Sequence, residues 1–501
     1  MENVLGSAWL REHYKLNQFI LTHISAIGSR MKVETDENGN VEQTFPPHYA
    51  PENSPLNHVE FLLKYDDLNL DFLESVFKKI DIIEVVRFIQ LKPKGSYERR
   101  IGYLYEFLTG NKISLEDLGI GNYIDLIDKK KYITGKIIKN QRWLINDNLL
   151  GDKNFCPVIR RTKLLTTLLE NDLTKLIENL SSVFPPDIYY RAVNYLYTKE
   201  TRSSYQIENE SPSIERVNLF IGLLEKAGKQ PSAILLSEKN LTGLQNEIVE
   251  PRFAATGFRN FQNYIGQTTF NFKEVIHYVC PPPEFVFSLM NGLAFAEGKS
   301  IGAPSIVRAA IIAFGFVFIH PFEDGNGRLH RFLIHDMLTR DKFVPQGMII
   351  PVSAHMVNHI KEYDKALESF SLQLMKKIKY SQSSENELTV TNPNEIESYY
   401  RYPDLTMECA YLAKTIKETI EEDIYLEMEF LVKYDEVKIA IQNIVDMPDK
   451  FIDLFIRLLH QNKGLFPIRK RQHFEKLTDN EILKMQTAFQ NTFNIPLNLK
   501  L

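Results

Sequence analysis

Apolar residues recur with a helical period along most of the chain. Stretches of this kind predict helices at 8–30, 162–183, about 186–209 and 305–319. The last of these, SIVRAAIIAFGFVFI, is apolar nearly all round, so we expect it to be the buried central helix of a domain. A further helix should begin near Asn326. The pattern as a whole predicts a mainly α protein.

Breaks in the pattern suggest where the chain changes structure. Residues 131–150 are β-branched and interrupted by Gly135, which allows a short hairpin. Residues 251–272 are aromatic-rich and lack a helical period, and the polar stretch 380–398 is typical of a linker. We therefore expect four parts: a mostly helical N-terminal domain, a central domain, a linker and a C-terminal helical domain, at residues 1–160, 161–378, 379–399 and 400–501.

Composition restricts the class of protein. Hydrophobic residues make up 44% and charged residues 25%, as in ordinary globular proteins, and the net charge of −5 argues against wholesale binding of nucleic acid. The basic run RKR at 469–471 still leaves a local nucleic-acid contact through the C-terminal domain open. Three distant cysteines give no disulfide framework, and the longest apolar run, Ala309–Ile319, is too short to span a bilayer. These features predict a cytoplasmic protein without a membrane partner.

The stretch HPFEDGNGRLHR, residues 320–331, carries the strongest chemical signal. His320 is largely neutral at pH 7 at its ordinary pKa, so it can accept a proton as a general base. Asp324 supplies one hard oxygen ligand, and Mg²⁺ commonly takes one or two carboxylates together with substrate phosphates. A base next to such a site suits transfer of a phosphorus group to a hydroxyl.

The second half of the same stretch suits the binding of phosphate. Gly325, Asn326 and Gly327 tolerate positive φ, so their N–H groups can converge on an anion at a helix N-terminus. Arg328 and Arg331 lie three apart on one helical face, and their forked donors match phosphate oxygens. The twelve residues together predict a site for a polyphosphate and Mg²⁺.

This stretch resembles the signature of the Fic family, His-Pro-Phe-x-Asp/Glu-Gly-Asn-Gly-Arg-x-x-Arg, at every defined position. The resemblance covers roughly residues 186–375 and implies protein AMPylation: AMP moves from ATP to a Ser, Thr or Tyr hydroxyl of a target protein, or of the enzyme itself. It implies that His320 is the base, that Phe322 packs the loop into the core and that Asp324 holds Mg²⁺. It also implies ATP-binding roles for Gly325, Asn326, Gly327, Arg328 and Arg331.

The resemblance extends to regulation. Ser204-Tyr-Gln-Ile-Glu208-Asn209 resembles the inhibitory motif Ser/Thr-x-x-x-Glu-Gly/Asn of Fic proteins whose inhibitory helix precedes the signature. It implies that Glu208 pairs with Arg331 and occupies the γ-phosphate region. The related Doc toxins, which phosphorylate, carry a lysine at the position of Gly327, so this glycine favours nucleotidyl transfer.

Two weaker similarities add candidate residues. The stretch 257–266 lies where the family has a β-hairpin flap that registers the target by strand pairing, which makes Arg259, Gln262 and Tyr264 candidates for that role. Tyr363 resembles a tyrosine of the adenine pocket.

The favoured function is an autoinhibited protein adenylyltransferase that uses ATP and Mg²⁺. One alternative is a hydrolase that removes AMP from a modified protein at the same site, with Glu208 orienting a water molecule. Another is a regulatory DNA- or protein-binding module with a vestigial Fic site, which the intact His320, Asp324 and Arg331 disfavour. A homo-oligomer remains open.

Overall fold

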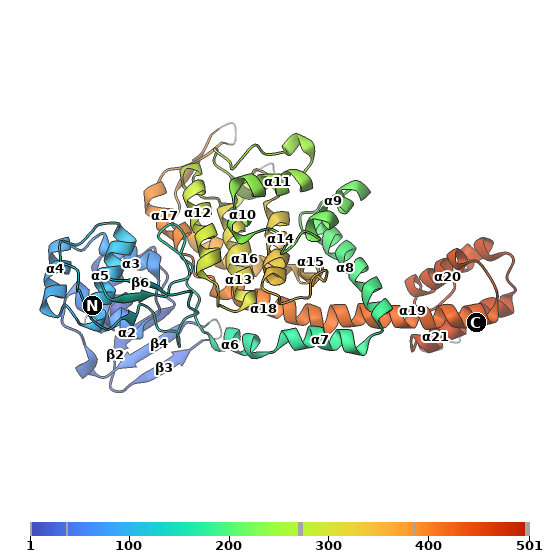
Figure 1. Ribbon diagram of the computed structural model, residues 1–501, viewed down its shortest axis with the longest axis horizontal. Helices are drawn as coiled ribbons and strands as arrows, with labels where there is room; N and C mark the ends of the chain where they lie inside the picture. Colours follow the sequence, from blue (N-terminus) through green and yellow to red (C-terminus); the bar gives the residue numbers. More distant parts are fainter. Residues whose placement is uncertain (1–2, 37–38, 269–273, 384–386, 496–501) are drawn as a thin grey trace. The chain divides into compact units, whose positions relative to one another are not determined.

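The computed structural model describes residues 3–36, 39–268, 274–383 and 387–495 (Figure 1). Contacts between residues group the chain into two compact units. The first consists of Met1–Asp172, Glu200–Gly347 and Val352–Ile416, and the second of Leu173–Lys199, Met348–Pro351 and Lys417–Leu501. The signature lies in the first unit.

Two consecutive helices form the centre of the first unit. Helix α13 (Ser305–Ile319) begins directly after Pro304 and is buried on every side, as its continuous apolar sequence predicts. Helix α14 (Asn326–Arg340) follows the signature turn and packs along α13 (Figure 1). The signature is therefore the connection between two buried helices.

Further helices belong to the first unit. They are α6 (Lys163–Glu170), α9 (Ile214–Leu224), α10 (Ser232–Leu235), α11 (Glu238–Ile248), α12 (Pro283–Lys299), α15 (Val352–Asn358), α16 (Ile360–Met375), α17 (Pro393–Arg401) and α18 (Thr406–Glu418). Helix α8 (Pro186–Ile207) covers most of the predicted range 186–209, and its last two turns belong to this unit. A short 3-10 helix, η2 (Pro251–Phe253), follows α11.

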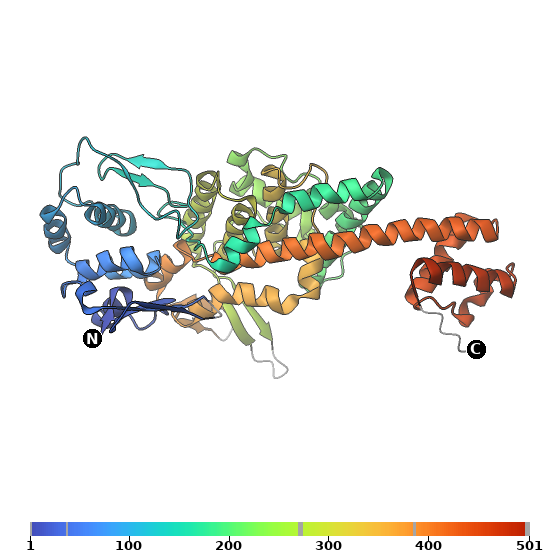
Figure 2. The ribbon, with the colours of Figure 1, turned by 90° about the horizontal axis from the view of Figure 1, so that it is seen from below.

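Among the residues that the structure describes, the first unit contains four small sheets, two of which have only two strands. Strands β8 (Tyr264–Thr268) and β9 (Glu274–Val279) pair antiparallel and extend from the helical core (Figure 2). Strands β10 (Tyr380–Gln382) and β11 (Leu388–Val390) also pair antiparallel. The three-stranded sheet contains β5 (Ile124–Asp125), β7 (Ile145–Asp147) and β6 (Ile138–Asn140), and its antiparallel pair β6–β7 confirms the hairpin predicted within 131–150.

The N-terminal part combines a four-stranded sheet with five helices. The sheet has the order β1 (Val4–Leu5), β2 (His23–Ile27), β4 (Val41–Phe45) and β3 (Lys32–Thr35). The helices are α1 (Gly6–His13), α2 (Pro55–Tyr65), α3 (Leu70–Phe77), α4 (Ile82–Leu91) and α5 (Ser96–Thr109), and η1 (Pro47–Tyr49) is a 3-10 turn.

The predicted helix over 8–30 is wrong. Helix α1 ends at His13, Lys15 adopts a positive φ of 55°, and the apolar residues that follow form β2. Strand β2 pairs parallel with β4, which is distant in sequence, and antiparallel with β1. These non-local hydrogen bonds override the local apolar spacing.

The second unit contains helices with a core of their own. Its elements include α7 (Leu173–Val183), η3 (Thr419–Ile424), α19 (Tyr425–Ile444), α20 (Asp449–Gln461), η4 (Ile468–Phe474) and α21 (Asp479–Thr492). Phe455, Leu459, Met485 and Phe489 are among its buried core residues. These observations confirm a mainly α protein. Across the described residues, no helix combines the length and the apolar character needed to cross a bilayer.

Candidate active site

His320 ends the buried helix α13 in a left-handed conformation, with φ 53° and ψ 61°. This conformation costs a residue other than glycine about 1–3 kcal/mol, so the surrounding contacts must hold it. The His320 Nδ1 atom lies 3.1 Å from the Val317 carbonyl oxygen. Because that carbonyl can only accept, Nδ1 carries the proton and Nε2 keeps the lone pair of a base.

The environment of His320 favours its neutral form. Burial, assisted by the nearby Arg259 guanidinium, lowers the pKa of His320 to about 4, although the hydrogen bond to the Val317 carbonyl and the Asp324 carboxylate act in the opposite direction. An imidazole with this pKa is unprotonated at neutral pH and therefore ready to accept a proton.

The turn after His320 is fixed from within. Gly325 has a φ of 85° and precedes the first residue of α14, Asn326, where the sequence predicted the helix to begin. The Asn326 side chain accepts from the Phe322 N–H at 3.0 Å and donates to the Phe322 carbonyl at 2.9 Å. Phe322 itself is buried in the core. These hydrogen bonds hold the turn, so the side chain of Asn326 serves the loop itself.

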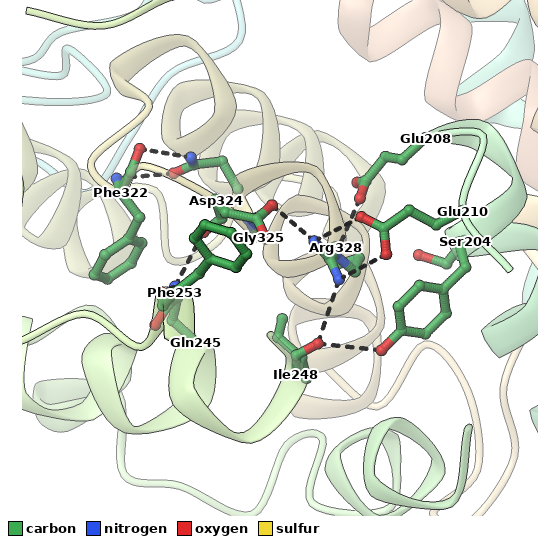
Figure 3. A network of polar contacts seen from close by, with 12 residues as sticks. Ser204, Glu208, Glu210, Gln245, Ile248, Phe253, Phe322, Asp324, Gly325 and Arg328 are labelled. Carbon is green, nitrogen blue, oxygen red and sulfur yellow. Dashed lines mark hydrogen bonds and ion pairs between the residues drawn. The ribbon is translucent and has the colours of Figure 1, made fainter. Parts of the chain in front are cut away.

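The two arginines of the signature are almost completely buried and surrounded by carboxylates. Arg328 Nη2 donates to Asp324 Oδ1 at 2.8 Å, and Arg328 Nε lies 3.0 Å from Glu208 Oε2. Arg331 Nη2 donates to Glu208 Oε1 at 2.7 Å. Burial opposes the charge on Arg328, yet the carboxylates around it outweigh burial and raise the pKa of its guanidinium. One carboxylate, that of Glu208, therefore bridges both arginines; Figure 3 shows its contact with Arg328.

Helix α8 places three polar side chains at intervals of four residues on the face that meets α14. Glu200 Oε1 lies 2.8 Å from His335 Nε2, and Ser204 Oγ accepts from Arg331 Nε at 2.6 Å. Glu208, just beyond the last residue of α8, completes the series on Arg331. The i, i+4 spacing puts all three on one side of the helix. The structure thus brings the predicted inhibitory residues Ser204 and Glu208 to the predicted partner, Arg331.

The sequence analysis did not identify a second carboxylate at the site, that of Glu210. Glu210 Oε1 lies 3.3 Å from Arg328 Nη2 (Figure 3). Its Oε2 lies 3.2 Å from Arg216 Nη2. Both guanidinium groups lie over the ring of Tyr205, about 5 Å from its centroid. Asn209, with a positive φ of 58°, turns the chain so that Glu208 and Glu210 both face the signature. That turn is a backbone feature, which the motif spacing does not reveal.

Gly327 leaves room for the inhibitory carboxylate. A Cβ atom at this position would overlap Glu208 Oε1 and would lie 3.2 Å from Arg331 Nη1. The glycine that the sequence analysis assigned to a phosphate cradle therefore faces Glu208 directly.

The remaining predicted residues lie around the same site. Tyr363 on α16 is buried, and its ring centroid lies 6.2 Å from that of His330; burial raises the pKa of Tyr363, and the neighbouring Arg331 acts in the opposite direction. Tyr264 lies in β8 and its hydroxyl donates to Glu274 Oε1 at 2.8 Å. Gln262 donates to the carbonyl oxygens of Asn263 and Cys280 at the base of the hairpin.

A buried glutamine, also absent from the sequence analysis, supports the turn. Gln245 on α11 donates from Nε2 to the carbonyl oxygens of Asp324, at 3.2 Å, and Phe253, at 3.1 Å (Figure 3). It thereby fixes the backbone of the residue proposed to bind the metal.

The residues present fit Mg²⁺ only in part. Asp324 is half-exposed, and its Oδ1 accepts from the Gly325 N–H at 2.6 Å and from Arg328. Among the described residues no group of three or more His, Cys, Asp or Glu side chains could hold a metal ion. A hard cation here would have Asp324 as its protein ligand, with phosphate oxygens and water completing the shell.

Comparisons with known proteins identify the region that contains the signature. Residues 235–338 match the model of the Fic/DOC family. The chain is similar to the protein adenylyltransferase fic-1 of Caenorhabditis elegans, with 35% identity over 72 residues. That match covers 14% of this chain and 14% of the relative, so the chain spans about one seventh of the length of this curated protein.

Solved structures of bacterial proteins are also similar. One is a Fic family protein from Desulfovibrio desulfuricans G20, with 16% identity, a TM-score of 0.38, and coverage of 66% of this chain and 87% of the other. A second is a Fic domain containing signaling protein from Bacteroides thetaiotaomicron VPI-5482, with 15% identity, a TM-score of 0.35, and coverage of 54% and 97%.

Proposed function

Because this chain is a protein of the Fic/DOC family, we propose that it is an autoinhibited protein adenylyltransferase, which transfers AMP from ATP to a hydroxyl side chain of a target protein or of itself. The observation that carries the proposal is the position of Glu208. Its carboxylate lies on both Arg328 and Arg331, the cations suited to the outer phosphates of ATP.

Each residue has a chemical part in this reaction. His320 accepts the proton of the attacking hydroxyl at Nε2, since Nδ1 is bound to the Val317 carbonyl. Arg328 and Arg331 bind the outer phosphates and so orient the α-phosphate for in-line attack, while pyrophosphate leaves. Asp324 would hold Mg²⁺, which supplies charge neutralisation at the phosphates when bound. Tyr363 is buried next to Arg331, and its resemblance to a tyrosine of the adenine pocket makes it the candidate residue for binding the base.

Autoinhibition follows from competition for the arginines. When Glu208 neutralises Arg331, the γ-phosphate loses that partner and ATP binds without correct alignment of its α-phosphate. The contacts of Ser204 with Arg331 and of Glu200 with His335 hold α8 in place and keep the carboxylate there. We expect the wild-type protein to transfer AMP slowly, and to transfer it faster once Glu208 no longer pairs with Arg331.

The test is self-modification with labelled ATP. Glu208→Gly should raise the labelling rate about ten- to a hundredfold, equivalent to a loss of about 1.4–2.7 kcal/mol of inhibitory contact. Glu208→Gln is the matched control for helix loosening, because it keeps the shape of the side chain and removes the charge. The proposal fails if both variants bind ATP and neither labels itself or a lysate protein faster than wild type. If they instead lose the capacity to strip AMP from a modified protein, removal of AMP is the function of this site.

A further inference from the structure

The end of α13 requires hydrogen-bond donors from elsewhere. The last carbonyl groups of any helix lack partners within the helix, and α13 is buried on every side, so water does not supply them. The left-handed turn at His320 ends the helix. The donors that meet them come from the segment that carries the β8–β9 hairpin.

Arg259 supplies most of these donors. Its Nε donates to the His320 carbonyl at 2.7 Å, its Nη2 lies 3.3 Å from the Ile319 carbonyl, and its own N–H donates to the Pro321 carbonyl at 2.8 Å. Three consecutive carbonyl groups of the signature loop therefore depend on one residue. A cation at this place also lies where the C-terminal end of the helix dipole is negative.

The same guanidinium binds both ends of the hairpin. Arg259 Nη1 donates to the Phe261 carbonyl at 2.8 Å, before β8, and Nη2 donates to the Pro281 carbonyl at 2.7 Å, after β9. Arg259 is only 5% exposed, and within the described parts of the chain no carboxylate pairs with it. An arginine that recognised a target would be expected at the surface; this one is directed into the protein.

Other side chains of the hairpin segment extend the contact on either side. The Tyr278 hydroxyl of β9 donates to the Phe318 carbonyl, and Asn263 Nδ2 donates to the Phe322 carbonyl at 3.2 Å. Every carbonyl group from Phe318 to Phe322 thus accepts from the hairpin segment.

We infer that Arg259 is a positioning residue, which fixes the backbone of His320 and ties it to the base of the β8–β9 hairpin, rather than a residue that contacts the target. This inference rests on the proposed transfer reaction, in which His320 is the base. A target segment aligned on the hairpin is then in fixed register with the imidazole, because both are bound to one guanidinium. The guanidinium also disfavours a positive charge on the nearby imidazole.

Two substitutions separate the geometry of Arg259 from its charge. Both are made in a Glu208→Gly background. Arg259→Gln removes the positive charge and the planar array of N–H donors, whereas Arg259→Lys keeps the charge and loses the planar array. We expect Arg259→Gln to lower kcat about ten- to a hundredfold, as displacement of a base does, with KM for ATP within about threefold. Arg259→Lys should also lower kcat. Arg252→Gln, which changes an exposed arginine nearby, is the matched control and should leave kcat unchanged.

The titration of His320 distinguishes positioning from a general loss of stability. Its pKa can be followed by NMR of labelled histidine, with His320→Ala assigning the signal. Arg259→Gln should move this pKa upward from about 4, and Arg259→Lys should move it less. Partial unfolding would lower the active fraction without moving the pKa of the folded protein. If Arg259→Gln leaves both kcat and the pKa unchanged, the inference is overturned.

Two further outcomes are decisive. If Arg259→Gln does not fold, Arg259→Lys provides the test, and a kcat equal to that of the Glu208→Gly parent overturns the inference. If the Glu208→Gly parent transfers no nucleotide, the proposed function fails, but the NMR titration needs no activity and still tests the link between Arg259 and His320.

Discussion

The His320 side of the signature and its arginine side are both buried, yet their partners differ in kind. Around His320 the contacts are hydrogen bonds to backbone carbonyl groups, made by Arg259, Tyr278 and neighbouring side chains. Around Arg328 and Arg331 the contacts are ion pairs with carboxylates. A phosphate can replace a carboxylate on an arginine, but no ligand replaces the donors to a buried backbone carbonyl. The arginine side can therefore exchange its carboxylate partners for phosphates, and we call it the exchanging side. The His320 side keeps its hydrogen bonds, and we call it the fixed side.

The largest effect should come from removing the base on the fixed side. In the Glu208→Gly background, His320→Ala should lower the labelling rate about 10²–10⁴-fold, the usual contribution of a general base. ATP affinity, measured by calorimetry, should change less than about threefold, because the arginine side is untouched. Exposed His473→Ala serves as the control. A rate within threefold of the parent would remove His320 from the mechanism.

Asp324 lies on the side that exchanges partners, since it already pairs with Arg328. Asp324→Asn keeps the shape of the side chain and removes the charge, so nucleotide affinity in the presence of Mg²⁺ should fall at least about tenfold. Titrating Mg²⁺ against ATP binding measures this. The neighbouring exposed Glu323→Gln should leave the Mg²⁺ dependence unchanged. An unchanged dependence in Asp324→Asn would mean that the metal is held elsewhere.

Glu210 should contribute less than Glu208 to inhibition. It is 34% exposed and lies 3.3 Å from Arg328, so solvent screens the pair, which is worth about 0.5–1 kcal/mol. Glu210→Gln should raise self-labelling about two- to fivefold. Glu215→Gln, on the exposed face of α9, is the control. Because Glu208 and Glu210 share Arg328, the double variant should differ from the sum of the two single effects. Equal effects of the two single changes would contradict the assigned order.

The smallest change is expected with pH. Since the folded-state pKa of His320 is about 4, the imidazole is almost fully neutral at pH 5.5, whereas at an ordinary pKa of about 6.5 only about a tenth would be. In Glu208→Gly, kcat at saturating ATP should therefore vary less than about twofold between pH 5.5 and 7.5, and fall only as pH approaches 4. The lowered pKa also means that stability declines as pH falls from about 6.5 through 4. An acid limb centred near 6.5 would show that His320 lies in a more exposed site.

Much of the exchanging side was predictable from the sequence. The Ser204–Glu208 spacing, the Gly-Asn-Gly turn and the arginines three apart all follow local helical geometry, and the structure brings these groups together. The sequence did not predict the role of Glu210, because the orientation of this residue depends on the positive φ of Asn209, which the motif spacing does not require. The structure thus adds a second carboxylate to a motif that was expected to have one.

The fixed side was much harder to predict. Arg259 binds backbone carbonyl groups, and a carbonyl has the same chemistry in every residue, so its partners leave no trace in the sequence. The fold shows the same division: α13 spans the range 305–319 that its helical pattern predicts, whereas the helix expected over 8–30 gives way to a strand paired with the distant Val41–Phe45. Local periodicity predicts local structure, and non-local hydrogen bonds override it.

Because Gly327 has no side chain, this one position affects both the binding of the nucleotide and its inhibition by Glu208. The space that the inhibitory carboxylate now occupies is open because this residue has no Cβ, and the phosphates of a bound nucleotide would approach the same bare backbone. A Cβ atom at this position would displace the Glu208 carboxylate and would also lie close to the phosphates. Variants that lose the restraint and leave the nucleotide site unaltered are therefore expected on the inhibitory segment, where Ser204, Glu208 and Glu210 lie.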